Sequence, residues 1–154
     1  MNAQVISVKW LLWAAASTLL WTGTVSAAPA GDLQLEAQLI WGTNDPKSPD
    51  PRHKPVEEAV AKRLKSLPFK WSNYFEVNRK RITVKPTAAS LVPLSGDCEI
   101  SVARLDDEQV ELILFGKGKL VGKVAQKLPK GELLVMGGNA PNFTGWFVVL
   151  KLAE

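Results

Sequence analysis

Most of this chain is a succession of short segments in which apolar and polar residues alternate, and this period most constrains the fold. A two-residue period places successive side chains on opposite faces of a β-strand. Clusters of Gly, Pro, Asn and Asp separate the segments about every 8 to 12 residues, a spacing typical of antiparallel sandwiches and barrels. The predicted strands are 32–41, 70–77, 81–85, 98–105, 109–115, 119–128, 132–136 and 144–152.

One segment has a helical period instead. Pro55 suits the first turn of a helix, where its missing N–H costs nothing. Val56, Val60 and Leu64 then recur at a helical spacing, and Pro68 ends the segment. The sequence therefore predicts a mainly β fold (α+β by strict count), an antiparallel β-sandwich or small barrel of about seven to eight strands with one amphipathic helix.

The first predicted strand has two different faces. Leu35, Leu39 and Trp41 lie on one face, whereas Glu36 and Gln38 lie on the other. This alternation predicts a half-buried strand. The predicted connections between elements are the loop 42–55, the turn 78–80, the long segment 86–96 and the loop 137–142.

The hairpin at residues 116–118 admits a two-residue or a three-residue loop. A three-residue loop pairs Leu112 with Gly122 on a wholly apolar face, and it sets Glu111 opposite Lys123 on the outer face. It also places the last glycine of the loop where a left-handed residue is wanted. We therefore predict the three-residue loop.

Residues 1–27 have the composition of a secretory signal peptide. Lys9 is their only charged side chain, an apolar run of about 12 residues follows from 10 to 21, and small residues precede the expected cut. The run is shorter than the roughly 20 residues of a spanning helix, which favours cleavage over an uncleaved anchor. We predict a single exported β-rich domain at 28–154, secreted or periplasmic, with no transmembrane segment after processing.

Cysteine and histidine usage limits the chemistry. One Cys and one His exclude a disulfide-built miniprotein and a Cys-based zinc module. Cys98 has no intrachain partner and opens a strand-like alternation, so we predict a buried core thiol; a thiol that pairs with another chain is the alternative. His53 lies in a Pro-rich loop, with no group in the sequence that marks a held imidazole. We predict no catalytic residue, no cofactor and no metal site.

Three consecutive acids, Asp106, Asp107 and Glu108, are the strongest carboxylate cluster. A glycosidase needs two carboxyl groups that face a cleft about 5 to 10 Å apart. A solvated turn explains three adjacent acids more simply. A small carboxylate-based hydrolase or lyase acting on an envelope polymer is therefore an alternative function and not the leading one.

Charge segregation is the one charge pattern above background. Segment 97–111 has six acids and one Arg, whereas 116–131 has five Lys and no acid. Lys119, Lys123 and Lys127 share one face of a regular strand, which suggests binding to an anionic lipid or polysaccharide. The alternative is protection of an exposed sheet edge. Nucleic acid is not expected, because interleaved aromatic residues are missing there.

The loop 137–142 is the second candidate binding element, together with the Trp that follows it. Its candidate residues are Gly138, Asn139, Asn142 and Trp146. Because no catalytic constellation stands out, the leading hypothesis is a small exported non-enzymatic binding or interaction module of the cell envelope or extracellular space. Its expected partner is another envelope protein or an anionic lipid or polysaccharide. A third hypothesis is an inhibitor or assembly subunit that uses this loop or a sheet edge.

Overall fold

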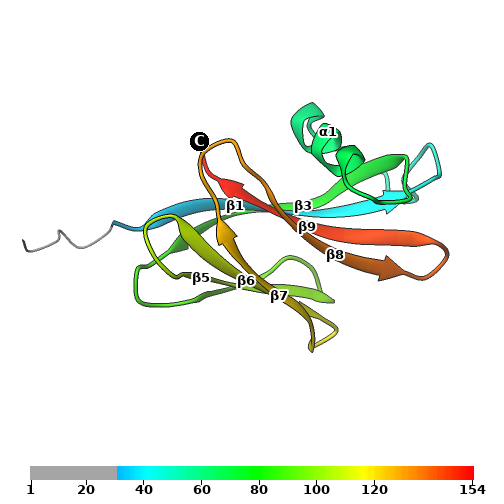
Figure 1. The fold of residues 1–154 in the computed structure, drawn as a ribbon. Coiled ribbons are helices and arrows are strands. Elements are labelled where there is room, and N and C mark those ends of the chain that lie inside the picture. The colour runs from blue at the N-terminus through cyan, green and yellow to red at the C-terminus, as the bar shows by residue number, and fades with distance from the viewer. Residues whose placement is uncertain (1–30) are drawn as a thin grey trace, which may run out of the picture.

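The computed structural model describes residues 31–154, which form two antiparallel β-sheets and one α-helix (Figure 1). The helix is α1 (Glu58–Ser66). The strands are β1 (Leu33–Thr43), β2 (Lys54–Pro55), β3 (Asn73–Val84), β4 (Ser90–Pro93), β5 (Cys98–Arg104), β6 (Gln109–Gly116), β7 (Lys119–Lys127), β8 (Leu134–Ala140) and β9 (Thr144–Leu152). The signal peptide predicted for 1–27 lies outside the described residues.

The two sheets stack as a sandwich, which confirms the predicted fold class. The first sheet has the strand order β2-β3-β1-β9-β8, and the second sheet has the order β4-β5-β6-β7. The described chain has nine strands where seven or eight were predicted, because β2 and β4 lie in expected connections and two expected strands form the single strand β3. Within residues 31–154, no helix is long and apolar enough to cross a membrane.

The main hydrophobic core lies between the two sheets. Leu35 of β1 contributes from the inner face of the first sheet, and Ile100 and Leu112 contribute from the second; all three are fully buried. Cys98 of β5 belongs to this core and is 6% exposed. Burial raises the pKa of its thiol to about 11, because the thiolate is poorly solvated there. The predicted buried core thiol is confirmed.

Helix α1 covers the opposite face of the first sheet, here called the outer face. Val60 and Leu64, four residues apart on α1, are buried against a cluster that includes Tyr74 of β3 and Phe147 of β9. The prediction of a half-buried β1 is therefore wrong. Its second face is also covered, and Gln38 is only 1% exposed.

Ion pairs connect the start of α1 to the outer face. The guanidinium of Arg79 on β3 contacts Glu36 at 3.0 Å, Glu76 at 2.6 Å and Glu57 at 2.5 Å. Lys151 on β9 contacts Glu57 at 3.2 Å. The hydrogen bond from Arg79 lowers the pKa of Glu57, the residue that precedes α1. The two cations thus hold the helix terminus against the sheet.

The turn predicted at 78–80 is wrong, because β3 continues through these residues. The register between β1 and β3 shifts between Leu39 and Ile40, which leaves Val77 without a partner in this ladder. Such a bulge bends a strand without ending the sheet. A polar run beside a bulge has the same composition as a turn, and for this reason the sequence was misleading.

The start of the helix was also predicted too early. Pro55 belongs to β2 and pairs with Phe75 of β3, and α1 begins at Glu58. Proline is tolerated at the edge of a sheet for the same reason that it is tolerated in a first helical turn, namely its missing N–H. The connection predicted at 86–96 contains the short strand β4, which pairs with β5.

The β6–β7 hairpin has a two-residue loop, so the predicted three-residue loop is wrong. Lys117 and Gly118 form this loop, both with positive φ, at 50° and 72°. The register then shifts, which leaves Val121 as an extra residue in β7. After this bulge Leu112 faces Val124, so the apolar face is restored by the extra residue in β7 and not by a longer loop.

Candidate functional site

At one end of the sandwich the first sheet extends beyond the second (Figure 1). β1 ends there, β8 ends there and β9 begins there. The second sheet therefore leaves part of the inner face of the first sheet uncovered at this end. The residues of that overhang line a hollow on the described part of the chain.

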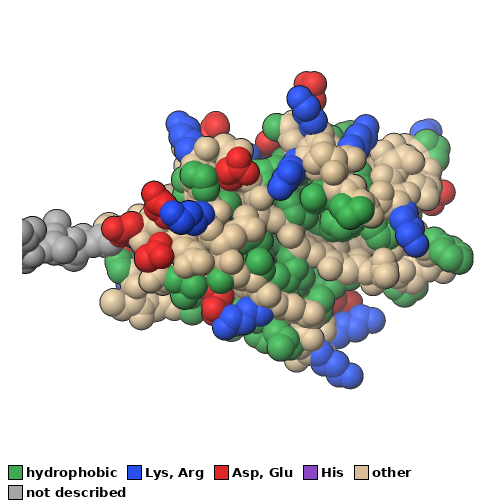
Figure 2. All heavy atoms as spheres, in the orientation of Figure 1, with side chains coloured by type: hydrophobic (Ala, Val, Ile, Leu, Met, Phe, Trp, Pro, Cys, Tyr) green, Lys and Arg blue, Asp and Glu red, His purple; other side chains and the backbone are tan. Residues whose placement is uncertain are grey.

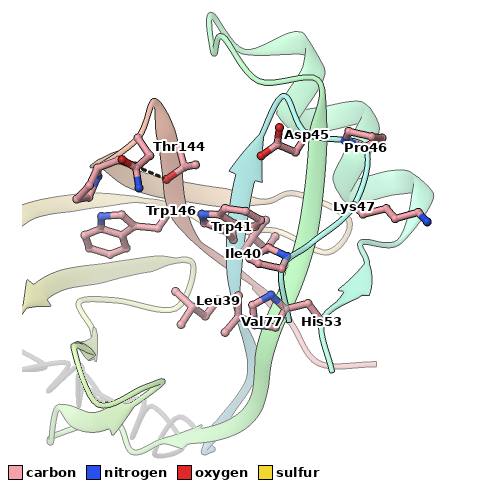
Figure 3. Close-up of a pocket in the computed structure, with 13 residues that line it drawn as sticks. Leu39, Ile40, Trp41, Asp45, Pro46, Lys47, His53, Val77, Thr144 and Trp146 are labelled. Atoms are coloured by element: carbon pink, nitrogen blue, oxygen red, sulfur yellow. Dashed lines mark hydrogen bonds between the residues drawn. The ribbon is translucent and has the colours of Figure 1, made fainter. Parts of the chain in front are cut away.

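This hollow, the first cleft, has a volume of about 870 Å³, within the range of roughly 300–1,000 Å³ that suits small-molecule sites. Its floor contains Trp41 of β1 and Trp146 of β9, which are partners in the β1–β9 ladder and lie side by side in Figure 3. Both indoles are half-buried. The cleft is lined by Leu39, Ile40, Trp41, Asp45, Pro46, Lys47, Pro49, His53, Val77, Pro141, Asn142, Thr144 and Trp146.

Loop 44–53 forms one wall of the first cleft, and local hydrogen bonds hold it in place. The side-chain oxygen of Asn44 accepts a hydrogen bond from the backbone N–H of Ser72 at 3.0 Å. The hydroxyl of Thr43 accepts one from the backbone N–H of Asp45 at 3.1 Å. The Asn73 side chain of β3 donates a third hydrogen bond to the carbonyl oxygen of Asp45 at 3.0 Å. These bonds hold the start of the loop against β1 and the beginning of β3.

His53 lies in this wall beside Trp41, with ring centroids 6.5 Å apart. Its Nδ1 is 2.7 Å from the hydroxyl of Ser48, and its Nε2 is 3.8 Å from the carboxylate of Asp50. Hydrogen bonds from Arg52 hold the pKa of Asp50 well below its usual range. The imidazole is therefore held, contrary to the sequence-based expectation, because the loop folds back on itself.

Polar groups surround the aromatic floor. Asp45, Asn142 and Thr144 line the cleft, and Asp45 is the one acid among its described lining residues. Within residues 31–154 the Asp45 carboxylate has no ion-pair partner and accepts no hydrogen bond within the structure. The side chain of Lys47 is directed away from the two indoles (Figure 3). The cleft thus offers hydrogen-bonding groups and little positive charge.

A second cleft of about 480 Å³ lies on the other side of Trp146, between the two sheets. The first sheet contributes Asn139 and Trp146, whereas the second contributes Gly116 and Val121. Leu39, Pro141 and Trp146 line both clefts. Trp146 therefore stands at the boundary between two neighbouring hollows.

The β8–β9 turn borders both clefts and has an unusual backbone. Asn142 and Phe143 both have positive φ, at 61° and 56°, a conformation that costs a bulky residue energy. The indole N–H of Trp71 donates a hydrogen bond to the carbonyl oxygen of Phe143 at 2.7 Å. A Cβ at Gly145 would lie 2.6 Å from the Trp71 ring, so this indole rests directly on the β9 backbone. Trp71 thus fixes the turn.

The candidate residues near the predicted loop 137–142 have two different outcomes. The loop prediction is wrong for residues 137–140, which belong to β8 and pair with β9. Asn142 and Trp146 line the first cleft, and Asn139 and Trp146 line the second. Gly138 lies beneath the indole of Trp146, where a Cβ would be 3.7 Å from Nε1.

The three candidate lysines lie elsewhere, on the edge strand β7. The bulge in β7 puts Lys119 out of phase with the other two, so the prediction that all three share one face is wrong. Lys123 pairs with Glu111 at 2.8 Å and Lys127 pairs with Glu108 at 2.7 Å. On the face in Figure 2, cations are scattered among acids. This placement suits protection of a sheet edge.

The carboxylates of the acidic turn, residues 106–108, make hydrogen bonds and ion pairs with nearby groups. The Asp106 carboxylate accepts hydrogen bonds from the backbone N–H groups of Glu108 and Gln109 at 2.9 and 2.6 Å, which lowers its pKa. Asp107 pairs with Arg104 at 3.0 Å. None of these acids lines either cleft. Their arrangement is that of a solvated turn.

Trp41, Asp45, His53 and Thr144 are among the residues of the first cleft that were not predicted as binding residues from the sequence. The alternation in the sequence places Trp41 on the apolar face of β1, and the structure confirms that face. The sequence does not reveal that the second sheet ends before it covers Trp41. Among residues 31–154 there is no group of three or more His, Cys, Asp or Glu side chains placed to hold a metal ion.

No family model matches this chain, and no curated protein or solved structure shows significant similarity to it.

Proposed function

We propose that this protein is an exported, non-enzymatic binding module that takes an uncharged saccharide of the cell envelope or extracellular space in the first cleft. The observation that carries the proposal is the pair Trp41 and Trp146, adjacent on the floor of a preformed cleft. Two half-exposed indoles on an uncovered sheet face have a large apolar area to contribute on binding.

The chemistry around the indoles favours a sugar. A pyranose ring has C–H groups on its faces, which suit the electron-rich face of an indole, and hydroxyl groups around its rim. Asp45, Asn142 and Thr144 supply acceptors and donors at the edge of the same floor. Such groups offset the cost of removing the sugar hydroxyls from water, because hydrogen bonds to protein replace their hydrogen bonds to water.

Two observations make a peptide or an anion less suitable. β1 and β9, which supply the floor, are interior strands paired on both sides, so an extended peptide finds no free backbone groups on them. The unpartnered carboxylate of Asp45 would repel an anionic ligand, and Lys47 points away from the floor. An uncharged ligand avoids this repulsion.

The non-enzymatic part of the proposal is supported by the acid count of the cleft. Hydrolysis of a glycosidic bond generally requires two carboxyl groups about 5 to 10 Å apart. Asp45 is the one residue with a carboxyl side chain among the described lining residues. The export part is supported by the signal-like composition of residues 1–27, and N-terminal sequencing of the mature protein tests it.

Titration calorimetry tests the binding proposal. The probes are uncharged glucan, mannan and N-acetylglucosamine oligosaccharides, with an acidic polysaccharide and an extended peptide library for comparison. We expect at least one neutral series to bind, and Trp41→Ala or Trp146→Ala to weaken its affinity about tenfold or more, equivalent to about 1.4 kcal/mol. Leu91→Ala is the control, because this exposed apolar side chain on β4 lines neither cleft, and it should bind normally.

Three outcomes would contradict the proposal. If no neutral saccharide binds, the ligand class is wrong. If the acidic polysaccharide binds best, and more weakly as salt rises, the lysines of β7 are the site. If peptides compete for Trp41 and Trp146, the cleft is a peptide site.

A further inference from the structure

The first and second clefts are neighbours and not separate sites. They share Leu39, Pro141 and Trp146, and Trp146 lies between them. Their volumes, about 870 and 480 Å³, each fall within the range that holds a ligand group of its own. A ligand that passes over Trp146 can occupy both hollows at once.

We infer that the ligand is an oligosaccharide chain that crosses Trp146 and places sugar units in both clefts, so that the protein recognises the interior of a polymer and not a single sugar. This inference rests on the proposed function. It assigns the second cleft, which lies between the sheets, as an additional subsite of the same binding surface.

The residues of the second cleft suit a further sugar unit. Trp146 and Val121 provide apolar contacts, and Ser95 adds a hydroxyl group to the same lining. The charged residues Asp97 and Lys117 also line it and have opposite signs, so no excess charge selects an anion there. Both hollows therefore offer the combination of apolar surface and hydrogen-bonding groups that one uncharged polymer needs.

Occupation of two linked subsites has a measurable consequence. Once a chain reaches the second cleft, its second contact is intramolecular and adds affinity without a second loss of translational freedom. Affinity should therefore rise in one step, by about tenfold or more, at the chain length that crosses Trp146. Further sugar units lie outside both clefts and should add little.

The experiment is a calorimetric titration of the full chain with a ladder of the neutral oligosaccharide that binds, from one to six units. Val121→Ala in the second cleft should weaken long chains to the affinity of short ones and leave short chains unchanged, because Val121 lines the second cleft and not the first. Asp45→Ala in the first cleft is the matched variant and should weaken short and long chains by the same factor. Circular dichroism and the melting temperature confirm that both variants fold.

The results separate the two proposals. If single sugars and hexamers bind equally, and Val121→Ala affects neither, the chain-crossing inference is wrong while the proposed function stands. If Val121→Ala weakens short and long chains alike, the second cleft is not a separate subsite and the inference is also wrong. If no member of the ladder binds, the proposed function itself fails.

Discussion

The two faces of the first sheet use tryptophan in opposite ways. On the outer face, Trp71 donates its indole N–H to the Phe143 carbonyl and rests on the backbone of Gly145. On the inner face, the Trp41 and Trp146 side chains make no hydrogen bond within residues 31–154, and both line a cleft. The same residue type is therefore a packing element on one face and an available surface on the other.

The difference follows from what covers each face. Helix α1 and the segment after it close the outer face, where Phe147 is 1% exposed and contacts Phe69 and Trp71. The second sheet closes the inner face only as far as its own strands extend. An apolar surface that stays exposed beside a rigid core can still be buried by a ligand, and its burial then contributes to the free energy of binding.

The largest expected effect is a change in the free energy of unfolding. It distinguishes a buried residue on the outer face from an exposed one at the open end of the inner face. Leu64→Ala should destabilise the protein by about 3 kcal/mol, because it leaves a cavity at a fully buried position. Trp41→Ala should cost about 1 kcal/mol, since its indole is half-exposed. Urea denaturation measures both. Equal losses would mean that Trp41 is a core residue and not part of an available surface.

A pair of adjacent glycines sharpens the comparison. A Cβ at Gly137 would clash with the carbonyl oxygen of Trp146 and lie 2.5 Å from the Phe147 ring, whereas one at Gly138 would meet the Trp146 indole at 3.7 Å. Gly137→Ala should therefore cost about 2 kcal/mol, as overpacking does, and Gly138→Ala about 0.5 kcal/mol or less. Thermal melts of the two variants test this order, which a reversed result would refute.

The β8–β9 turn that joins the two faces should be improvable. Phe143 is 94% exposed and has a positive φ, which asparagine tolerates better than phenylalanine. Phe143→Asn should stabilise the protein by about 1 kcal/mol and leave the Trp71 hydrogen bond in place, because that bond uses the backbone. A loss of stability in denaturant titrations would show that the Phe143 ring has a packing role.

The smallest expected effect is the pH dependence of the outer-face ion pairs. Arg79 lowers the pKa of Glu57 in the folded state, so this group stabilises the protein above its unfolded pKa of about 4.3 and the contribution is lost as pH falls through the folded pKa. Stability measured between pH 6 and 3 should therefore fall less steeply in Glu57→Gln than in the natural protein. Identical slopes would show that the ionisation of Glu57 does not contribute to the pH dependence of stability.

The sequence predicted those parts of the fold that depend on local periodicity. The bounds of β9 and the buried position of Cys98 both follow from alternation, and both are confirmed. The errors at Val77 and Val121 are bulges, in which one extra residue changes the face of every residue after it. Such an insertion is decided by pairing with a distant strand, so local sequence does not reveal it.

The candidate site was predicted only in part, for a related reason. Asn142 and Trp146 were selected from the composition of one segment, and they do line the first cleft. Trp41 and His53 come from a distant strand and its following loop, and their place in the same cleft depends on the β1–β9 register and on the shorter second sheet. Neither the strand register nor the extent of the second sheet can be predicted from the sequence near these residues.

The most direct test of the account is the response of three indole N–H resonances to ligand. In nitrogen–proton correlation spectra of the labelled protein, a neutral oligosaccharide should shift the indole signals of Trp41 and Trp146 in a saturable way. The signal of Trp71 should stay fixed, because its N–H is already bonded to Phe143. Shifts confined to Trp71, or no indole shift at saturating ligand, would contradict the claim that the open end of the inner face is the binding surface.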